Sequence, residues 1–266
     1  MKNILLLVHD DDGQEARLHT ALDVTRALKG HLTCIAVTPP VVIAGDLYAG
    51  FGEKVIISDE HVSEARNKTA LSVRLAHEEV SWDWVDTYGE IVPNVLQAAS
   101  LADLIVLNRK LDDYPVPDMR GITSRILMHT RMPVVAVPEG LAKFNVNGKA
   151  LIAWDGQTSV IETMRACVPL LGLASEVEIF CIRDGPLQAE PAEAAKYLSW
   201  HGIAAEVRVL KHSTEAVARL VAKECENRQA DYVLMGAYSH GRMLETFGGT
   251  TRRMLTDSAL PLVLGH

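Results

Sequence analysis

The chain has 266 residues, 48% hydrophobic and 23% charged, the proportions of an ordinary globular protein, and this length predicts about two domains. Its 26 lysines and arginines against 34 aspartates and glutamates give a net charge of −8, which argues against binding nucleic acid or docking on anionic membranes. No apolar run approaches the roughly 18 residues of a membrane span. The four cysteines are far apart and form no CxxC pair, which argues against a disulfide framework or structural zinc. We expect a cytoplasmic protein.

The first half alternates short apolar runs with amphipathic stretches, a pattern typical of a parallel sheet with crossover helices. The predicted strands are Ile4–Val8, Leu32–Val37, Trp82–Asp86, Leu104–Leu107 and Val134–Val137. The predicted helices are Ala16–Leu28, Ser63–Glu79 with Ser63 as its N-cap, and a third that contains Val95–Leu101.

The second half repeats this plan. Its predicted strands are Ala150–Trp154, Val177–Ile182, Ala205–Leu210, Tyr232–Met235 and Leu262–Leu264. Its predicted helices are Ser159–Leu171, Glu190–Trp200, Thr214–Asn227 and one that begins near Gly249.

An internal repeat relates the two halves. A shift of 128 residues places Ala230-Asp231 on Ala102-Asp103 and Pro261 on Pro133 without gaps. Near the start of each half the shift is 145, which matches Asp10 with Asp155. The difference predicts an insertion in the first half, which we assign to Pro39–Ile57.

Residues 139–149 are polar, contain glycines and lack periodicity, so they read as a linker. We therefore predict an α/β protein of two Rossmann-like, five-stranded parallel-sheet domains in tandem. The first domain covers residues 1–140 and the second covers residues 149–266. The two domains are expected to pack as a pseudo-dimer, and exposed edge strands leave a homodimer open.

The segment that indicates chemistry follows the strand at Tyr232–Met235. It runs from Gly236 through Ser239, His240, Gly241 and Arg242 to Gly248, Gly249, Thr250 and Thr251. Glycines let a backbone approach a ligand, and the helix N-terminus near Gly249 offers free N–H groups that suit phosphates. Thr250 and Thr251 add hydroxyl donors, and His240 or Arg242 adds charge.

This segment resembles the nucleotide-binding signature of the universal stress protein family: Gly, two residues, Gly, nine residues, Gly, then Ser or Thr. Here Gly236, Gly249 and Thr250 match, whereas Ser239 replaces the middle glycine. A register that uses Gly248 with a one-residue deletion also remains open, because Gly241 is displaced by two. The two-copy form resembles the tandem members of that family, which have an adenine nucleotide α-hydrolase-like fold.

The resemblance implies ATP as ligand, with or without Mg²⁺. It implies that Asp155 lies near the adenosine and that backbone at Ile182 and Arg183 meets the adenine edge. The glycine segment and its Ser or Thr would hold the phosphates.

The first half departs from this signature, with Asn108 and Leu111 at the positions of two glycines and only Gly121 retained. Its loop, Lys110–Asp118, carries three carboxylates that would repel phosphates. We expect a structural or regulatory role for this half. The clustered carboxylates of Asp10–Asp12 suggest either a metal site or a solvated turn, and we favour the turn.

Three functions remain open. The leading one is a tandem universal stress protein that binds ATP in its C-terminal half and has a regulatory or protective role in stress response. No residue is assigned to catalysis, so any ATPase activity would be slow. The alternatives are a scaffold that binds a partner without nucleotide, and a nucleotide α-hydrolase-type enzyme such as an adenylyl transferase. The sequence lacks the HIGH-type histidine pair that such transferases usually carry.

Overall fold

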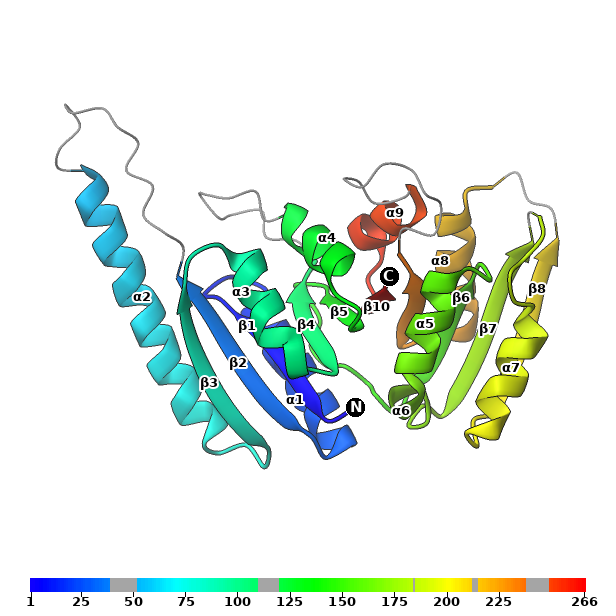
Figure 1. Cartoon of the computed structure of the whole chain (residues 1–266), viewed down its shortest axis with the longest axis horizontal. Coiled ribbons are helices and arrows are strands. Elements are labelled where there is room, and N and C mark those ends of the chain that lie inside the picture. Colours follow the sequence, from blue (N-terminus) through cyan, green and yellow to red (C-terminus); the bar gives the residue numbers. More distant parts are fainter. Residues whose placement is uncertain (39–51, 110–119, 184, 212–214, 238–248) are drawn as a thin grey trace.

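The computed structural model describes residues 1–38, 52–109, 120–183, 185–211, 215–237 and 249–266 (Figure 1). Every strand that the sequence predicts is present, within two residues at each end. The strands are β1 (Asn3–Val8), β2 (His31–Thr38), β3 (Ser81–Tyr88), β4 (Leu104–Asn108), β5 (Val134–Val137), β6 (Lys149–Trp154), β7 (Glu176–Arg183), β8 (Ala205–Lys211), β9 (Tyr232–Gly236) and β10 (Leu262–Gly265).

The helices agree with the prediction in type and less closely in their ends. They are α1 (Gln14–Leu28), α2 (Gly52–Leu75), α3 (Ile91–Ala98), α4 (Arg120–His129), α5 (Thr158–Ala166), α6 (Val168–Leu171), α7 (Pro191–Trp200), α8 (Val217–Arg228) and α9 (Gly249–Asp257). The sequence pattern did not predict α4.

Two helix boundaries correct the prediction. Ser63 lies inside α2 and is not its N-cap, because no helix-breaking residue follows Gly52 and the helix extends back to that glycine. The last part of the predicted insertion is therefore helical, while residues 39–51 lie outside the described residues. The helix predicted over Ser159–Leu171 is two helices that meet at Cys167, because Pro169 has no N–H to continue the ladder.

The ten strands form one sheet in the order β3-β2-β1-β4-β5-β10-β9-β6-β7-β8. Each half has the same order and is parallel throughout, so the predicted repeat of two five-stranded parallel units is confirmed. The two units are not separate sheets, because β5 and β10 pair antiparallel, with Val135 opposite Val263. This pairing places the halves about a pseudo-twofold axis, as Figure 1 shows.

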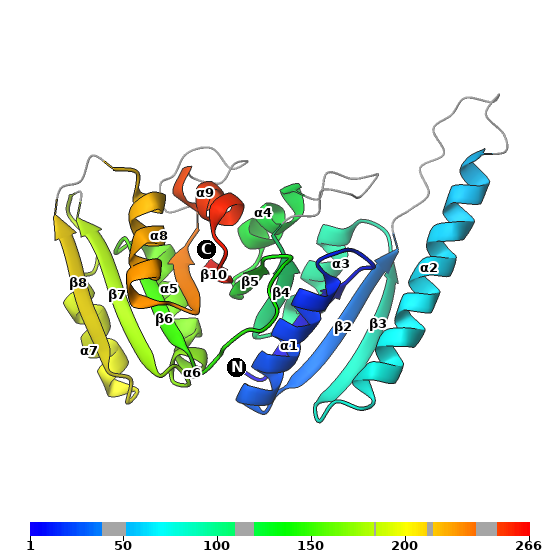
Figure 2. The same cartoon turned by 180° about the vertical axis from the view of Figure 1, so that it is seen from behind.

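Helices cover both faces of the sheet. Along β1, Ile4, Leu6 and Val8 point to one face while Leu5 and Leu7 point to the other. The first face packs against α1, α2, α5, α6 and α7, and the second against α3, α4, α8 and α9. Figures 1 and 2 show this arrangement from opposite sides. None of the helices in the described ranges is long and apolar enough to cross a bilayer.

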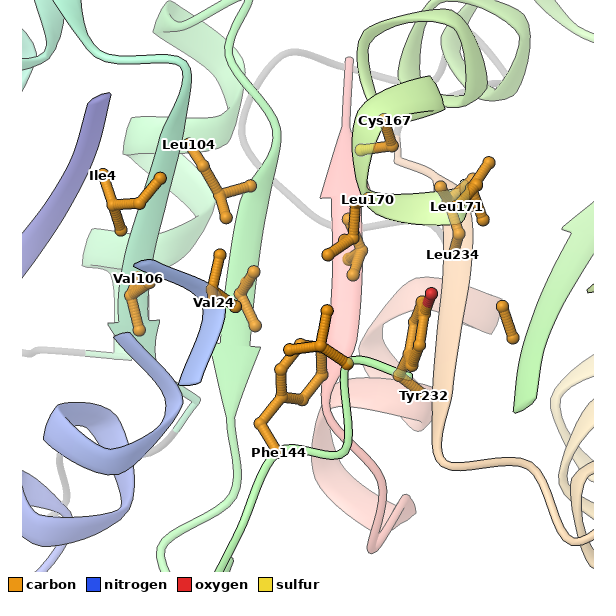
Figure 3. Close-up of a cluster of buried hydrophobic side chains, with 14 of the residues drawn as sticks. Ile4, Val24, Leu104, Val106, Phe144, Cys167, Leu170, Leu171, Tyr232 and Leu234 are labelled. Carbon is orange, nitrogen blue, oxygen red and sulfur yellow. The ribbon is translucent and has the colours of Figure 1, made fainter. Parts of the chain in front are cut away.

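The connection between β5 and β6 packs into the core instead of running over the surface. Phe144 and Val146 are buried, and the Phe144 ring lies 5.3 Å from that of Tyr232 in β9. The Phe144 N–H donates to Asp23 Oδ2 of α1 over 3.1 Å. Figure 3 shows Phe144 among side chains of both halves, including Val24 and Tyr232. One apolar cluster is therefore shared by the two halves.

Candidate functional site

Parallel α/β sheets place ligands at the carboxyl ends of their strands, so this edge of the second half is the candidate site. Asp155 follows β6 there and is half-buried. Its Oδ1 accepts the N–H of Gln157 over 3.0 Å. Gly156 has a φ of +67°, and a Cβ on it would lie 2.8 Å from the carbonyl oxygen of Ala189. The turn is thus held by an Asp cap and by a glycine that no other residue could replace without strain.

The structure corrects the partner of Asp155 in the repeat. Ile4 pairs with Leu104 as Ala150 pairs with Tyr232, so the residue at the strand end that corresponds to Asp155 is His9, one before Asp10. The sequence shift that relates the two halves is 146 at the first strand and 145 at the second, because the first half has one more residue between these strands.

The capping role in the first half belongs to a different aspartate. Asp11 Oδ1 accepts the N–H of Gly13 over 2.7 Å, as Asp155 does for Gln157. The alignment of Asp10 with Asp155 is therefore wrong by one residue, and the cap that corresponds to that of Asp155 is made by Asp11.

The end of β7 contributes Ile182 and Arg183, both half-buried. Arg183 Nη1 donates to Glu190 Oε1 over 3.1 Å, and this pairing holds the pKa of the Glu190 carboxyl below its ordinary value. Glu190 also begins α7 with a capping box. The Arg183 guanidinium therefore has an internal partner, which leaves its backbone as the group suited to a ligand.

The segment after β7 lies against the turn after β6. Trp154 Nε1 donates to the carbonyl of Ala189 over 3.0 Å, and the Ala189 N–H donates to that of Gly156 over 3.2 Å. Thr158 Oγ1 donates to Gln188 Oε1 over 3.0 Å. These bonds tie the region expected to meet adenine to the region expected to meet ribose.

Gly236 ends β9 and packs directly against the first turn of α5. A Cβ at this position would overlap Ser159 Oγ and lie 2.7 Å from the backbone nitrogen of Val160. In the first half the same strand–helix contact has its glycine on the helix side instead of the strand side. There Asn108 ends β4, and a Cβ on Gly13 would overlap its Nδ2. Close packing of strand and helix thus requires one glycine in each half, and sequence reasoning missed Gly13 because its partner is distant in the chain.

The N-terminus of α9 begins at Gly249, which is exposed, and no atom of the described structure lies within 4 Å of a Cβ built there. Thr250 is half-buried, whereas Thr251 is only 5% exposed. In the first half, the corresponding Thr123 donates its hydroxyl to the carbonyl of Asn108 over 3.0 Å. By analogy Thr251 faces the core, so Thr250 is the better placed hydroxyl for a ligand.

Several predicted site residues cannot be located. They are Ser239, His240, Gly241, Arg242 and Gly248, which lie outside the described residues, as does the acidic loop at 110–118.

A cavity of about 430 Å³ opens beside this edge. Its walls are Gln157, Thr158 and Ser159 of the second half, Met128, His129, Thr130 and Arg131 of the first half, and His266. Ser159 is the residue that Gly236 abuts, and His266 Nδ1 lies 3.4 Å from the carbonyl oxygen of Ala237. The cavity therefore begins where β9 ends, and its volume is that of a small-ligand site.

The corresponding edge of the first half carries a buried ion pair. Arg17 is 2% exposed and donates to both carboxylate oxygens of Asp11, over 2.9 and 2.7 Å. His9 Nδ1 lies 2.9 Å from Glu64 Oε1. No group of three or more His, Cys, Asp and Glu side chains in the described ranges is placed to hold a metal ion. Asp11 thus stabilises the turn after β1 by accepting hydrogen bonds from Gly13 and Arg17.

No protein-family model and no curated protein matches this sequence. Solved structures match along its whole length. A universal stress protein from Archaeoglobus fulgidus has 14% identity and a TM-score of 0.73, over 99% of this chain and 97% of that one. A putative universal stress protein from Pseudomonas aeruginosa has 16% identity and a TM-score of 0.59, over 100% and 93%. At such identities the likeness establishes the fold: the chain has the fold of a tandem universal stress protein from end to end.

Proposed function

We propose that the chain is a cytoplasmic tandem universal stress protein that binds one adenine nucleotide at the carboxyl edge of its C-terminal half. The observation that carries the proposal is the N-terminus of α9. No atom of the described residues lies within 4 Å of a Cβ built on Gly249, which belongs to the motif that leaves β9 at Gly236. The first N–H groups of a helix have no partner within it and favour anions. Nucleotide binding would let the protein act as a regulatory or protective factor in stress response.

The residues present fit ATP in three places. The N–H groups of Gly249 and Thr250, with the Thr250 hydroxyl, suit phosphates. Asp155 uses Oδ1 for its turn, and in the described structure Oδ2 has no hydrogen bond, which leaves it for ribose hydroxyls. The backbone at Ile182 and Arg183 suits the adenine edge. The resemblance adds Ser239, His240, Gly241, Arg242 and Gly248 to the phosphate site, and Mg²⁺ would be held chiefly through the phosphates.

The proposal gives the first half a structural or regulatory role. Asn108 stands where the second half has Gly236, and the Asp11–Arg17 pair occupies the turn at the strand end. No general base is assigned near the phosphates, so ATP hydrolysis would be slow. A homodimer through the edge strands β3 and β8 remains compatible with the sheet order.

A second candidate is a scaffold that binds a partner without nucleotide. One observation favours it: two of the proposed site residues, Gly236 and Asp155, are also required by the fold itself. Gly236 is required by Ser159 and Val160, and Asp155 caps the turn through Gln157. These roles would persist in a protein that had lost its ligand.

Nucleotide content separates the two candidates. The purified protein is denatured, the released nucleotides are quantified, and the melting temperature is measured with added ATP. Nucleotide binding predicts released adenine nucleotide, or a melting temperature that rises with ATP concentration because the ligand binds only the folded state. If no nucleotide is released and the melting temperature does not rise at millimolar ATP, the result supports the scaffold.

A further inference from the structure

The two halves place opposite charges at corresponding corners of the molecule. Where α4 ends, the first half presents His129 and Arg131. A shift of 128 residues maps these onto Asp257 and Ala259, where α9 ends. Arg131 therefore makes this corner cationic in the first half, whereas Asp257 makes it acidic in the second.

The hydrogen bonds confirm that these corners correspond. The N–H of Met132 donates to Thr130 Oγ1 over 3.1 Å, and the N–H of Leu260 donates to Ser258 Oγ over 3.1 Å. Each pair lies between the last helix of its half and the last strand, at the same spacing. The charge difference is thus a difference at equivalent positions, not an artefact of alignment.

Each corner faces the carboxyl edge of the opposite half. His129, Thr130 and Arg131 line the cavity of about 430 Å³ together with the first turn of α5. In the other direction Arg109, which follows β4, donates from Nη1 to the carbonyl of Met254 in α9 over 3.4 Å. The cause is the antiparallel pairing of β5 with β10, which brings the end of each last helix beside the other half's strand ends.

We infer that Arg131 and His129 of the first half bind the phosphates of the nucleotide held by the second half. The inference rests on the proposed function, and it adds a specificity determinant supplied across the pseudo-dimer. Arg131 is exposed at the cavity wall and has no ion pair in the part of the chain that the structure describes. An arginine so placed can donate a fork of N–H groups to phosphate oxygens.

The corresponding corner at the end of α9 explains why the phosphates would bind at only one of the two edges. Asp257 at the first half's edge would repel phosphates. The chain as a whole is acidic, with a net charge of −8, so a cationic corner beside one cavity is a local exception. The tandem arrangement would then complete a single site from two unequal halves.

The test is an affinity measurement on Arg131→Ala, with Arg125→Ala as the matched control. Arg125 lies in α4, which ends two residues before Arg131. It is exposed and does not line the cavity, so its removal changes the net charge equally. Titration calorimetry with ATP and with adenosine should show a loss of about tenfold in ATP affinity for Arg131→Ala and no change for adenosine. Arg125→Ala should match the wild type for both, and Arg131→Lys should retain part of the ATP affinity.

The outcomes separate this inference from the proposed function. If the wild type binds ATP and Arg131→Ala binds it within twofold as tightly, the inference is wrong and the proposed function stands. An equal loss for ATP and adenosine would also overturn it, since the effect would not be on phosphates. A wild type that binds neither ligand would overturn both.

Discussion

At the scale of single residues, Asp155 uses one carboxylate oxygen to cap its turn and would use the other to bind the proposed ligand. Asp155→Ala should weaken ATP and adenosine equally, by about ten- to a hundredfold, because a hydrogen bond to a charged group is worth about 1.5–3 kcal/mol. Asp155→Asn keeps an oxygen for the Gln157 N–H, so it should retain the melting temperature and still lose affinity. Calorimetric titration and thermal melts on both variants measure this.

Thr250→Ala is the opposite control, since it should weaken ATP and spare adenosine. A purely structural Asp155 would show the reverse of the expected result: a lower melting temperature for Asp155→Ala with both affinities unchanged.

Glu178 of β7 is buried beside Glu224 of α8, with Arg228 paired to it. Burial raises the pKa of Glu178 above its ordinary value of 4.5; the charge of Arg228 opposes this rise and the charge of Glu224 adds to it. The folded protein therefore holds this proton to higher pH than the unfolded chain does. Its contribution to stability is full below the unfolded pKa and is lost as pH rises through the folded pKa.

Glu178→Gln should remove this dependence, because the amide cannot ionise. We expect the melting temperature of the wild type, relative to this variant, to fall as the pH is raised above 4.5. The pH dependence that Glu206 contributes to stability has the opposite sign, because pairing with Arg228 lowers its pKa. Glu206 is present in both proteins, so its contribution cancels when their melting temperatures are compared. Glu176→Gln, on the exposed end of the same strand, is the control. Parallel curves for wild type and Glu178→Gln would contradict the assignment.

Residue patterns predicted the candidate site only in part. Gly236 and Gly249 stood out because glycines near a strand end and a helix start are local signals. The reason for Gly236, its contact with Ser159, and the compensating Gly13 depend on contacts between distant segments. Arg131 carried no local signal at all, because only the pairing of β5 with β10 brings it to the other half's edge.

At the scale of elements, the turn between β6 and α5 depends on Gly156. A side chain there would face both a φ of +67° and an oxygen 2.8 Å away. Gly202 has a similar φ of +76°, but a Cβ built on it meets no atom of the described residues within 4 Å. We expect Gly202→Ala to cost about 1 kcal/mol of unfolding free energy from backbone strain alone, and Gly156→Ala to cost clearly more.

Chemical denaturation of the two variants measures the difference. Equal losses would mean that the contact between Gly156 and the segment at Ala189 contributes nothing to stability.

Strands were predicted more closely than helices for a physical reason. A buried parallel strand is an apolar run with polar ends, so Val134–Val137 is bounded by its own composition. Helix ends depend on caps and packing. A residue that can cap a helix, such as Ser63, can equally lie inside one that begins further upstream. The union of both halves in one sheet had no sequence signal, since β5 and β10 look like any buried strands.

At the scale of the whole molecule, the halves should unfold together because they share an apolar cluster. Phe144 lies between them and is 1% exposed (Figure 3). Phe144→Ala should cost about 3–5 kcal/mol by leaving a cavity. We expect calorimetry to show a single transition that moves to lower temperature. Two transitions, of which only one moves, would mean that the halves are independent.

The central claim, one nucleotide site in the C-terminal half, is tested most directly by titrating ATP into the wild type and two matched variants. Gly249 and Gly121 correspond in the repeat and lie in the first turn of α9 and α4. No atom of the described residues lies within 4 Å of a Cβ built on either glycine. Both aspartate substitutions should therefore fold. The account predicts one ATP per wild-type chain, binding abolished by Gly249→Asp, and binding unchanged in Gly121→Asp. Two sites per chain, no binding, or a loss in Gly121→Asp equal to that in Gly249→Asp would contradict it.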